Sequence, residues 1–191
     1  VLCDQQWLQI LFAEEIAVSK YVRDWNDFEH KDTYKKVLGG LTLLDTIQTN
    51  VGMNRIVQFV EDDQEKAVLT AFGAFEAIHA KSYSYIFTTL CTNEEIDEVF
   101  AWVKKNKYLQ YKASKIADTY NAIQEDDKKT LWQAMFASVM LESFLFYSGF
   151  FYPLYLAGQG RMMATADMIN LILRDESIHG VYVGLLAQET Y

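Results

Sequence analysis

Two of the three histidines in this sequence follow a glutamate three positions earlier. These pairs are Glu76 with His79 and Glu176 with His179. Residues three apart lie on the same face of an α-helix, so each pair can hold one metal ion. The third histidine, His30, stands in a polar run, which indicates a position on the surface.

Isolated acidic residues in apolar segments can complete such a site. Asp45 and Glu142 each follow apolar neighbours, and each lies on a further predicted helix of its own. An ionised carboxylate in apolar surroundings is unfavourable unless it is paired, hydrogen-bonded or bound to a cation. Arg174 is the only basic residue in the short segments that carry the four acidic residues. A bound cation is therefore favoured over salt bridges.

This combination is the pattern of a dimetal carboxylate bundle. In such bundles two helices each give a Glu-x-x-His pair, and two others each give one carboxylate. Four carboxylates balance the charge of two divalent ions, and oxygen and imidazole ligands without thiolate favour iron or manganese. The sequence predicts that two Fe or two Mn ions are held by six ligands: Asp45, Glu76, His79, Glu142, Glu176 and His179.

Long helices are expected to position these residues. Hydrophobic residues make up 51% of the chain, there is one proline, and apolar positions recur at helical spacing. We expect a loop at about 12–27, Asn93 as a helix cap, and a close helix contact at Gly39 and Gly40. Pro153 is expected to distort or end its helix. The predicted helices are at about 4–11, 28–51, 61–90, 94–105, 108–123, 125–151 and 165–188.

Composition excludes several classes of protein. The apolar content argues against disorder, and two cysteines are too few for a disulfide scaffold. A net charge of −9 disfavours binding to nucleic acid or to an anionic membrane. We find neither an uninterrupted apolar run long enough to span a bilayer nor a signal peptide, so the chain is expected to be soluble and cytoplasmic.

Four segments together resemble the radical-generating small subunit of class I ribonucleotide reductase, in the class Ib branch. They are Leu41-Thr42-Leu43-Leu44-Asp45-Thr46, the segment from Glu76 to Ser84, the segment from Leu141 to Phe150, and the segment from Arg174 to Gly180. The resemblance runs in order from about Glu14 to Gln188. It implies an all-α, ferritin-like helical bundle, with residues 1–191 forming a single domain.

The resemblance also implies the roles of particular residues. The six ligands match the six named above, and Tyr83 matches the tyrosine that stores the radical. Phe146, Phe150 and Ile172 match its apolar pocket, and Asp175 matches the carboxylate that orients His79. In the family, reduced metals react with oxygen, or with an oxidant from a flavodoxin-like activase when manganese is used. The subunit is a homodimer, and its radical starts nucleotide reduction in the large subunit.

Two departures from the family pattern stand out. The residue matching the tryptophan that relays the electron between subunits is Leu11 or Phe12, and Trp7 lies about one helical turn away. The family continues past Tyr191 with further helices and a tail that docks on the large subunit. Two other functions stay open at this point, a di-iron oxidase or oxygenase without radical export and a ferritin-like metal-storage protein.

Overall fold

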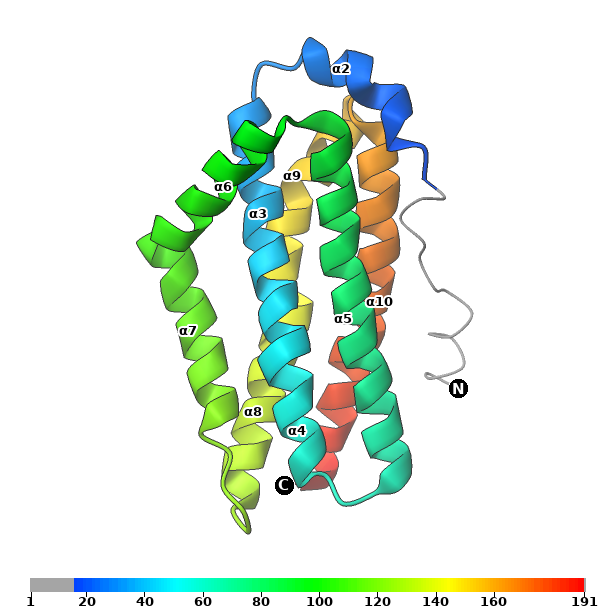
Figure 1. Cartoon of the computed structure of the whole chain (residues 1–191). Coiled ribbons are helices and arrows are strands. Elements are labelled where there is room, and N and C mark those ends of the chain that lie inside the picture. Colours follow the sequence, from blue (N-terminus) through cyan, green and yellow to red (C-terminus); the bar gives the residue numbers. More distant parts are fainter. Residues whose placement is uncertain (1–15, 191) are drawn as a thin grey trace.

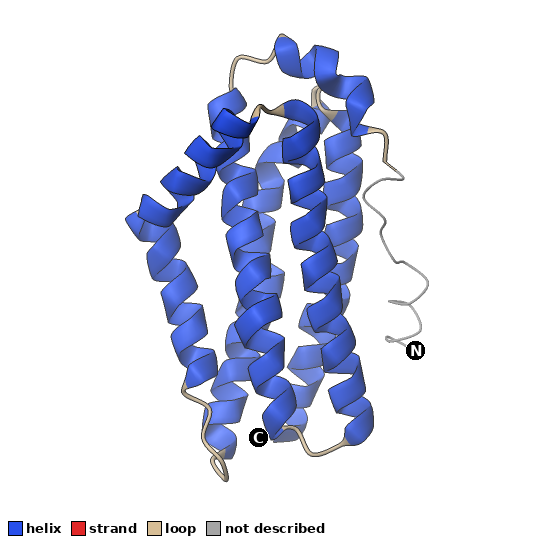
Figure 2. Cartoon of the chain, in the orientation of Figure 1, coloured by secondary structure: helices blue, strands red, loops and turns tan. Residues whose placement is uncertain are grey.

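The computed structural model describes residues 16–190, apart from the side chain of Tyr21, and these residues form helices joined by short connections (Figure 2). This part of the chain contains no strand, so the predicted all-α class is confirmed. The predicted helix at 4–11, together with Trp7, Leu11 and Phe12, lies outside the described residues. The helices are η2 (Val18–Tyr21), α2 (Val22–Asn26), α3 (Lys31–Ile47), η3 (Gln48–Met53), α4 (Asn54–Phe59), α5 (Asp63–Leu90), α6 (Asn93–Lys105), α7 (Lys107–Asn121), α8 (Lys128–Met140), η4 (Leu141–Leu145), α9 (Phe146–Gly158) and α10 (Met163–Thr190).

Long helical rods make up the core of the bundle (Figure 1), and the order of the helices defines four of them. One rod is α3 continued by η3 and α4, and another is α8 continued by η4 and α9, while α5 and α10 are each a single helix. The first rod packs against α5 and α9, and α10 packs against α8, α9 and α5. Helices α6 and α7 lie along one side of the bundle against α3, and α2 crosses one end (Figure 1). Each rod therefore has one face turned towards the other three.

Local capping explains where several of these helices begin. Asp62 accepts hydrogen bonds from the backbone amides of Gln64 and Glu65 at the start of α5. At α6 the cap is Thr92, one residue before the predicted Asn93. Thr92 and Glu95 bond each other's backbone amides in a capping box, which satisfies two amides that a helix start leaves free.

The predicted loop before Asp27 was wrong, because η2 and α2 form there. The aromatic ring of Trp25 packs edge-on to Tyr34 with centroids 5.9 Å apart, and only 3% of the surface of Trp25 is exposed. Helix α2 also packs against α5, and η2 packs against α5 and α10. Contacts with distant parts of the chain therefore stabilise a segment that is too short to show a periodic pattern in the sequence.

Pro153 was expected to distort or end its helix, and the second alternative is wrong. Pro153 is buried inside α9, which continues to Gly158. A proline inside a helix costs about 3 kcal/mol, and burying a large apolar side chain contributes about 1.5 to 3 kcal/mol. Phe150 and Leu156, on either side of Pro153, are both buried, so their packing outweighs the effect of the proline.

Glycines let two pairs of helices approach closely. A Cβ atom on Gly39 would lie 2.9 Å from Cγ2 of Val103, which confirms the predicted close contact at this glycine. A Cβ atom on Gly149 in α9 would lie 2.5 Å from Cδ2 of Leu41 in α3. Leu41 is itself buried, so it has little room to move away.

We expect Gly149→Ala to lower the free energy of unfolding by about 1 to 3 kcal/mol, the range for overpacking a well-packed core. Gly158→Ala is the matched control, because a Cβ atom there meets nothing within 4 Å. Urea denaturation of both variants measures the difference. A Gly149→Ala protein as stable as the control would contradict the close contact of α3 with α9.

The rod Lys128–Gly158 is long and apolar enough to cross a membrane, with a mean hydropathy of 1.4 in its most apolar window. This property was not expected from the sequence, because charged and polar residues interrupt every apolar run in the rod. Of that window 44% is buried inside the structure, and Glu142 near the middle of the rod faces the centre of the bundle. A single helix of this length and composition is weak evidence for a membrane span, because the core helix of a bundle can have the same properties.

Candidate metal centre

The six predicted ligands lie halfway along the four rods, and none of them is exposed to solvent. Asp45 is in the last turn of α3, directly before the π-helical segment η3. Glu142 lies inside the second π-helical segment, η4. A π-helical turn adds a residue to the helix and so rotates the following side chains, and such turns are frequent at functional sites.

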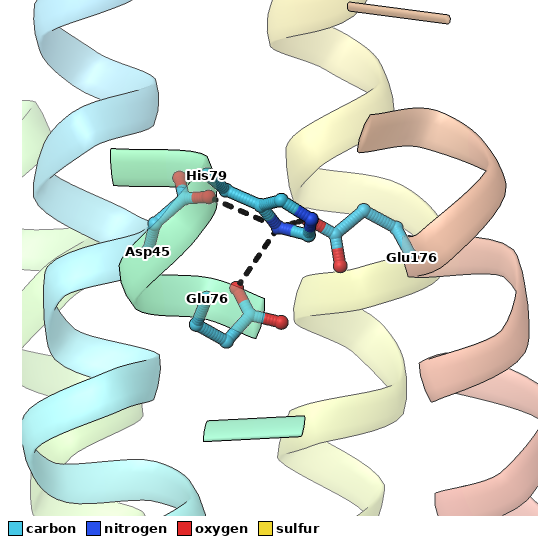
Figure 3. A group of neighbouring side chains, drawn as sticks. All are labelled: Asp45, Glu76, His79 and Glu176. Atoms are coloured by element: carbon cyan, nitrogen blue, oxygen red, sulfur yellow. Dashed lines mark ion pairs between the residues drawn. The ribbon is translucent and has the colours of Figure 1, made fainter. Parts of the chain in front are cut away.

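The structure brings these side chains together as a carboxylate-histidine cluster made of two overlapping groups. In each group the possible ligand atoms lie within 4.8 Å of one another. Figure 3 shows the first group, with the side chains of Asp45, Glu76 and Glu176 directed towards His79. The groups are Asp45, Glu76, His79 and Glu176, and Glu76, Glu142, Glu176 and His179.

Glu76 and Glu176 belong to both groups, which refines the prediction that each Glu-x-x-His pair holds one ion. The Nδ1 atom of His79 lies 3.0 Å from Oε1 of Glu176, on the opposite helix, and 3.7 Å from Glu76 in its own helix. The Nδ1 atom of His179 lies 2.8 Å from Oε1 of Glu76 and 3.1 Å from Glu176. Each of the two glutamates therefore contacts both histidines.

The hydrogen bonding of the cluster fits bound cations. Among the described residues, twelve buried side-chain oxygen and nitrogen atoms have no hydrogen-bond partner, and eight of these belong to the cluster. They include both oxygens of Asp45, both oxygens of Glu76 and Nδ1 of His79. Buried polar atoms normally have partners, and carboxylate and imidazole donors suit iron or manganese. Two divalent cations would satisfy this donor set.

Asp175 contacts the ring of His79. Its Oδ2 atom lies 3.0 Å from Nε2 of His79, and only 1% of the surface of Asp175 is exposed. A proton on Nε2 donated to this carboxylate leaves the lone pair of Nδ1 directed at the cluster. This arrangement is common for metal-binding histidines, because it fixes the tautomer and the orientation of the ring.

Burial and crowding shift the protonation of the cluster. Burial raises the pKa of Asp45 and of Glu142 well above the usual range, and the charge of Glu76 adds to both shifts. Burial alone would lower the pKa of His79 and His179, but the facing glutamates outweigh it and raise the pKa of His179 to about 9. Without metal, the cluster therefore takes up protons to offset its negative charge.

The metal-free protein is expected to lose stability as the pH rises. A group whose pKa is raised in the folded state stabilises the fold while it is protonated. The stabilisation from His179 is therefore complete below its ordinary pKa of 6.5, and it is lost as the pH approaches the raised pKa of about 9. The raised pKa values of His79, Asp45 and Glu142 also make the metal-free fold less stable as the pH rises. Bound metal replaces these protons and removes the dependence.

Thermal melts of the metal-free and Mn(II)-loaded protein test this at the two ends of that range, pH 6.5 and pH 9. We expect the melting temperature of the metal-free form to fall by about 5 °C or more, while that of the loaded form stays nearly constant. Melting temperatures that fall equally in the two forms would contradict the assignment of these protons to the cluster.

Tyr83 is one helical turn from His79 and has no exposed surface. Its hydroxyl is another of the buried atoms without a hydrogen-bond partner. Burial raises the pKa of Tyr83 well above its ordinary value, and the charge of Asp45 raises it further, so the phenol keeps its proton. Three side chains matched to its apolar pocket are buried in the same core cluster: Phe146, Phe150 and Ile172.

Sequence reasoning missed a buried polar network beside the cluster. Gln48 donates hydrogen bonds to Glu142 and Ser138, and it accepts one from Tyr120. The available signal was spacing, since Gln48 is three residues after Asp45 and Ser138 is four residues before Glu142. Tyr120, on the outer helix α7, gave no such signal.

Fold and site together define the class of this protein, a ferritin-like helical bundle with a dimetal site of carboxylates and histidines in its core. The family model described as "Ribonucleotide reductase, small chain" matches residues 2–191. The chain therefore belongs to the ribonucleotide reductase small-chain family.

Individual relatives agree with this family. The ribonucleoside-diphosphate reductase subunit beta of Bacillus subtilis (strain 168) is 57% identical over 191 residues, covering 98% of this chain and 58% of the relative. The subunit beta of Bacillus phage SPbeta is 53% identical, with the same coverage of both chains. The crystal structure of dimanganese(II)-NrdF from Streptococcus sanguinis has a TM-score of 0.92 and 43% identity, covering 98% of this chain and 65% of that chain.

These similarities confirm the resemblance to the class Ib branch. The chain spans less than two thirds of the length of the first two of these relatives.

Proposed function

We propose that this chain is the radical-generating part of a ribonucleoside-diphosphate reductase beta subunit. Its six cluster residues would hold two iron or two manganese ions, and Tyr83 would store the radical. Residues 1–191 would form one ferritin-like domain. The observation that carries the proposal is the Tyr83 hydroxyl, which is fully buried next to the cluster and has no hydrogen-bond partner.

A buried phenol without a partner is suited to storing an unpaired electron. When bound, the two metal ions would supply the oxidising power, either from oxygen or from an oxidant delivered to manganese. The Tyr83 phenol would give up one electron to that oxidant and its hydroxyl proton to a base at the cluster. Complete burial keeps water and other reductants away from the resulting radical, and Phe146, Phe150 and Ile172 supply apolar surroundings.

The other side chains act by orientation. Asp175 would hold His79 with Nδ1 directed at one ion, since its own oxygen is 3.0 Å from Nε2. Glu76 and Glu176 would contribute to both halves of the site, because each belongs to both groups of ligand atoms. Asp45 and His79 would then complete one half of the site, and Glu142 and His179 the other half.

Partners follow from the family and are part of the proposal. The relatives are named as beta subunits of ribonucleoside-diphosphate reductase, which supports a homodimer that works with the large catalytic subunit in the cytoplasm. The similar NrdF structure from Streptococcus sanguinis is a dimanganese(II) form, which supports manganese for this chain, with iron as the other candidate. If manganese is used, a flavodoxin-like activase would be a further partner.

Anaerobic loading with Fe(II), followed by oxygen, tests the proposed function. We expect about two iron ions per chain and a tyrosyl signal in electron paramagnetic resonance. Two ions without a tyrosyl signal, under iron and also under manganese with an activase, would favour a di-iron oxidase or oxygenase. Uptake of many ions per chain would favour metal storage.

A further inference from the structure

Glu142 is held by a side chain that is not itself a candidate ligand. Nε2 of Gln48 donates a hydrogen bond to Oε1 of Glu142, and a second one, of 2.8 Å, to Oγ of Ser138. The hydroxyl of Tyr120 donates to Oε1 of Gln48 at 2.6 Å. All four side chains are completely buried. Water therefore does not compete with these hydrogen bonds.

The Tyr120 hydroxyl determines which end of the Gln48 amide faces Glu142. An amide has a donor end and an acceptor end, and only the donor end can face a carboxylate favourably. By donating to Oε1 of Gln48, Tyr120 keeps the NH2 group turned towards Glu142 and Ser138. Without that hydroxyl the amide could rotate and place its oxygen against the negatively charged carboxylate.

Gly52 leaves the space that this network needs. It follows Gln48 by four residues in the π-helical segment η3. A Cβ atom on Gly52 would collide with Oε1 of Gln48 and would lie 2.9 Å from Cε2 of Tyr120. The backbone of η3 thus forms one wall of a slot that fits the Gln48 amide and the Tyr120 ring.

We propose that Gln48 and Tyr120 are positioning residues for Glu142, which fix its carboxylate so that Oε2 is the atom presented to the metal. The Oε1 atom is occupied by Gln48, whereas Oε2 has no hydrogen-bond partner. The inference rests on the proposed dimetal site and assigns how one half of that site is shaped.

The two halves of the site are oriented in different ways. In the half with Asp45, the carboxylate of Asp175 fixes His79, and neither oxygen of Asp45 has a hydrogen-bond partner. In the half with His179, the neutral amide of Gln48 fixes Glu142 instead. Loss of the Gln48 network should therefore weaken the Glu142 half and leave the Asp45 half nearly unchanged.

Titration of the full chain with Mn(II), with free Mn(II) measured by electron paramagnetic resonance, tests this asymmetry. We expect Gln48→Leu to weaken one of the two Mn(II) dissociation constants by about 10- to 100-fold and to change the other by less than about threefold. Tyr120→Phe, which removes only the hydroxyl, should weaken the same constant by about 3- to 10-fold. Tyr34→Phe is the control, because it also removes a buried hydroxyl that donates a hydrogen bond, in this case to Thr165.

A double-mutant cycle with Glu142→Ala separates positioning from general damage. If Gln48 acts through Glu142, adding Gln48→Leu to Glu142→Ala changes Mn(II) binding no further. Three results would overturn the inference. They are Mn(II) dissociation constants that are unchanged in Gln48→Leu, an equal loss of Mn(II) affinity at both sites, and a loss of affinity that persists when Gln48→Leu is added to Glu142→Ala. A wild-type chain that does not bind two Mn(II) ions would instead overturn the proposed metal site, and the inference with it.

Discussion

Tyr83→Phe is expected to abolish the tyrosyl signal while two metal ions per chain still bind. The phenol ring is the proposed storage site, and phenylalanine cannot be oxidised at this potential. The hydroxyl makes no hydrogen bond to any cluster residue, so its loss should leave metal binding intact. Electron paramagnetic resonance after loading with Fe(II) and oxygen measures the radical, and metal analysis of the same samples measures the ions.

The same substitution makes an independent prediction for stability. A buried donor without a partner costs about 1 to 3 kcal/mol, so Tyr83→Phe should leave the free energy of unfolding unchanged or raise it by about 1 kcal/mol. Tyr34→Phe is the matched control, since it should keep the radical but lose stability with its hydrogen bond to Thr165. A radical that survives in Tyr83→Phe would place radical storage on another residue.

Glu176→Ala is expected to remove both metal ions, whereas Glu142→Ala should remove about one. Glu176 belongs to both groups of ligand atoms, and Glu142 belongs to one. Removing a ligand should weaken binding by more than the 10- to 100-fold that loss of an outer partner typically causes. Calorimetric titration with Mn(II) measures the number of ions and their affinities in each variant.

Glu189→Ala serves as a control for this pair, because Glu189 is an exposed carboxylate near the end of α10, outside the cluster. Its Mn(II) binding should match that of the wild type. Equal losses in Glu176→Ala and Glu142→Ala would contradict the distinction between a shared glutamate and one that belongs to a single group.

The positions brought together in the cluster could be predicted because they depend on local helix geometry. The spacing of Glu76 and His79 places both on one face of α5 whatever the rest of the chain does. Asp45 and Glu142 stood out because a lone carboxylate in an apolar helix needs a partner. The sharing of Glu76 and Glu176 depends on how α5 and α10 face each other, which spacing within one helix does not specify.

Features that depend on distant contacts could not be predicted. Tyr120 and Gln48 are 72 residues apart, and only the packing of α7 against η3 brings them together. Helices η2 and α2 depend on packing against α5, and η2 also packs against α10. Pro153 was expected to distort or end its helix because of its local propensity, but the helix continues past it, with buried neighbours on both sides.

Anomalous diffraction from Mn(II)-soaked crystals of the full chain, recorded at the manganese edge, tests the proposed dimetal site most directly. We predict two peaks per chain inside the bundle, separated by the carboxylates of Glu76 and Glu176. One peak should lie beside Asp45 and His79, and the other beside Glu142 and His179. A single peak, or peaks only at acidic residues on the surface, would contradict the assignment of these six side chains as the ligands of two ions.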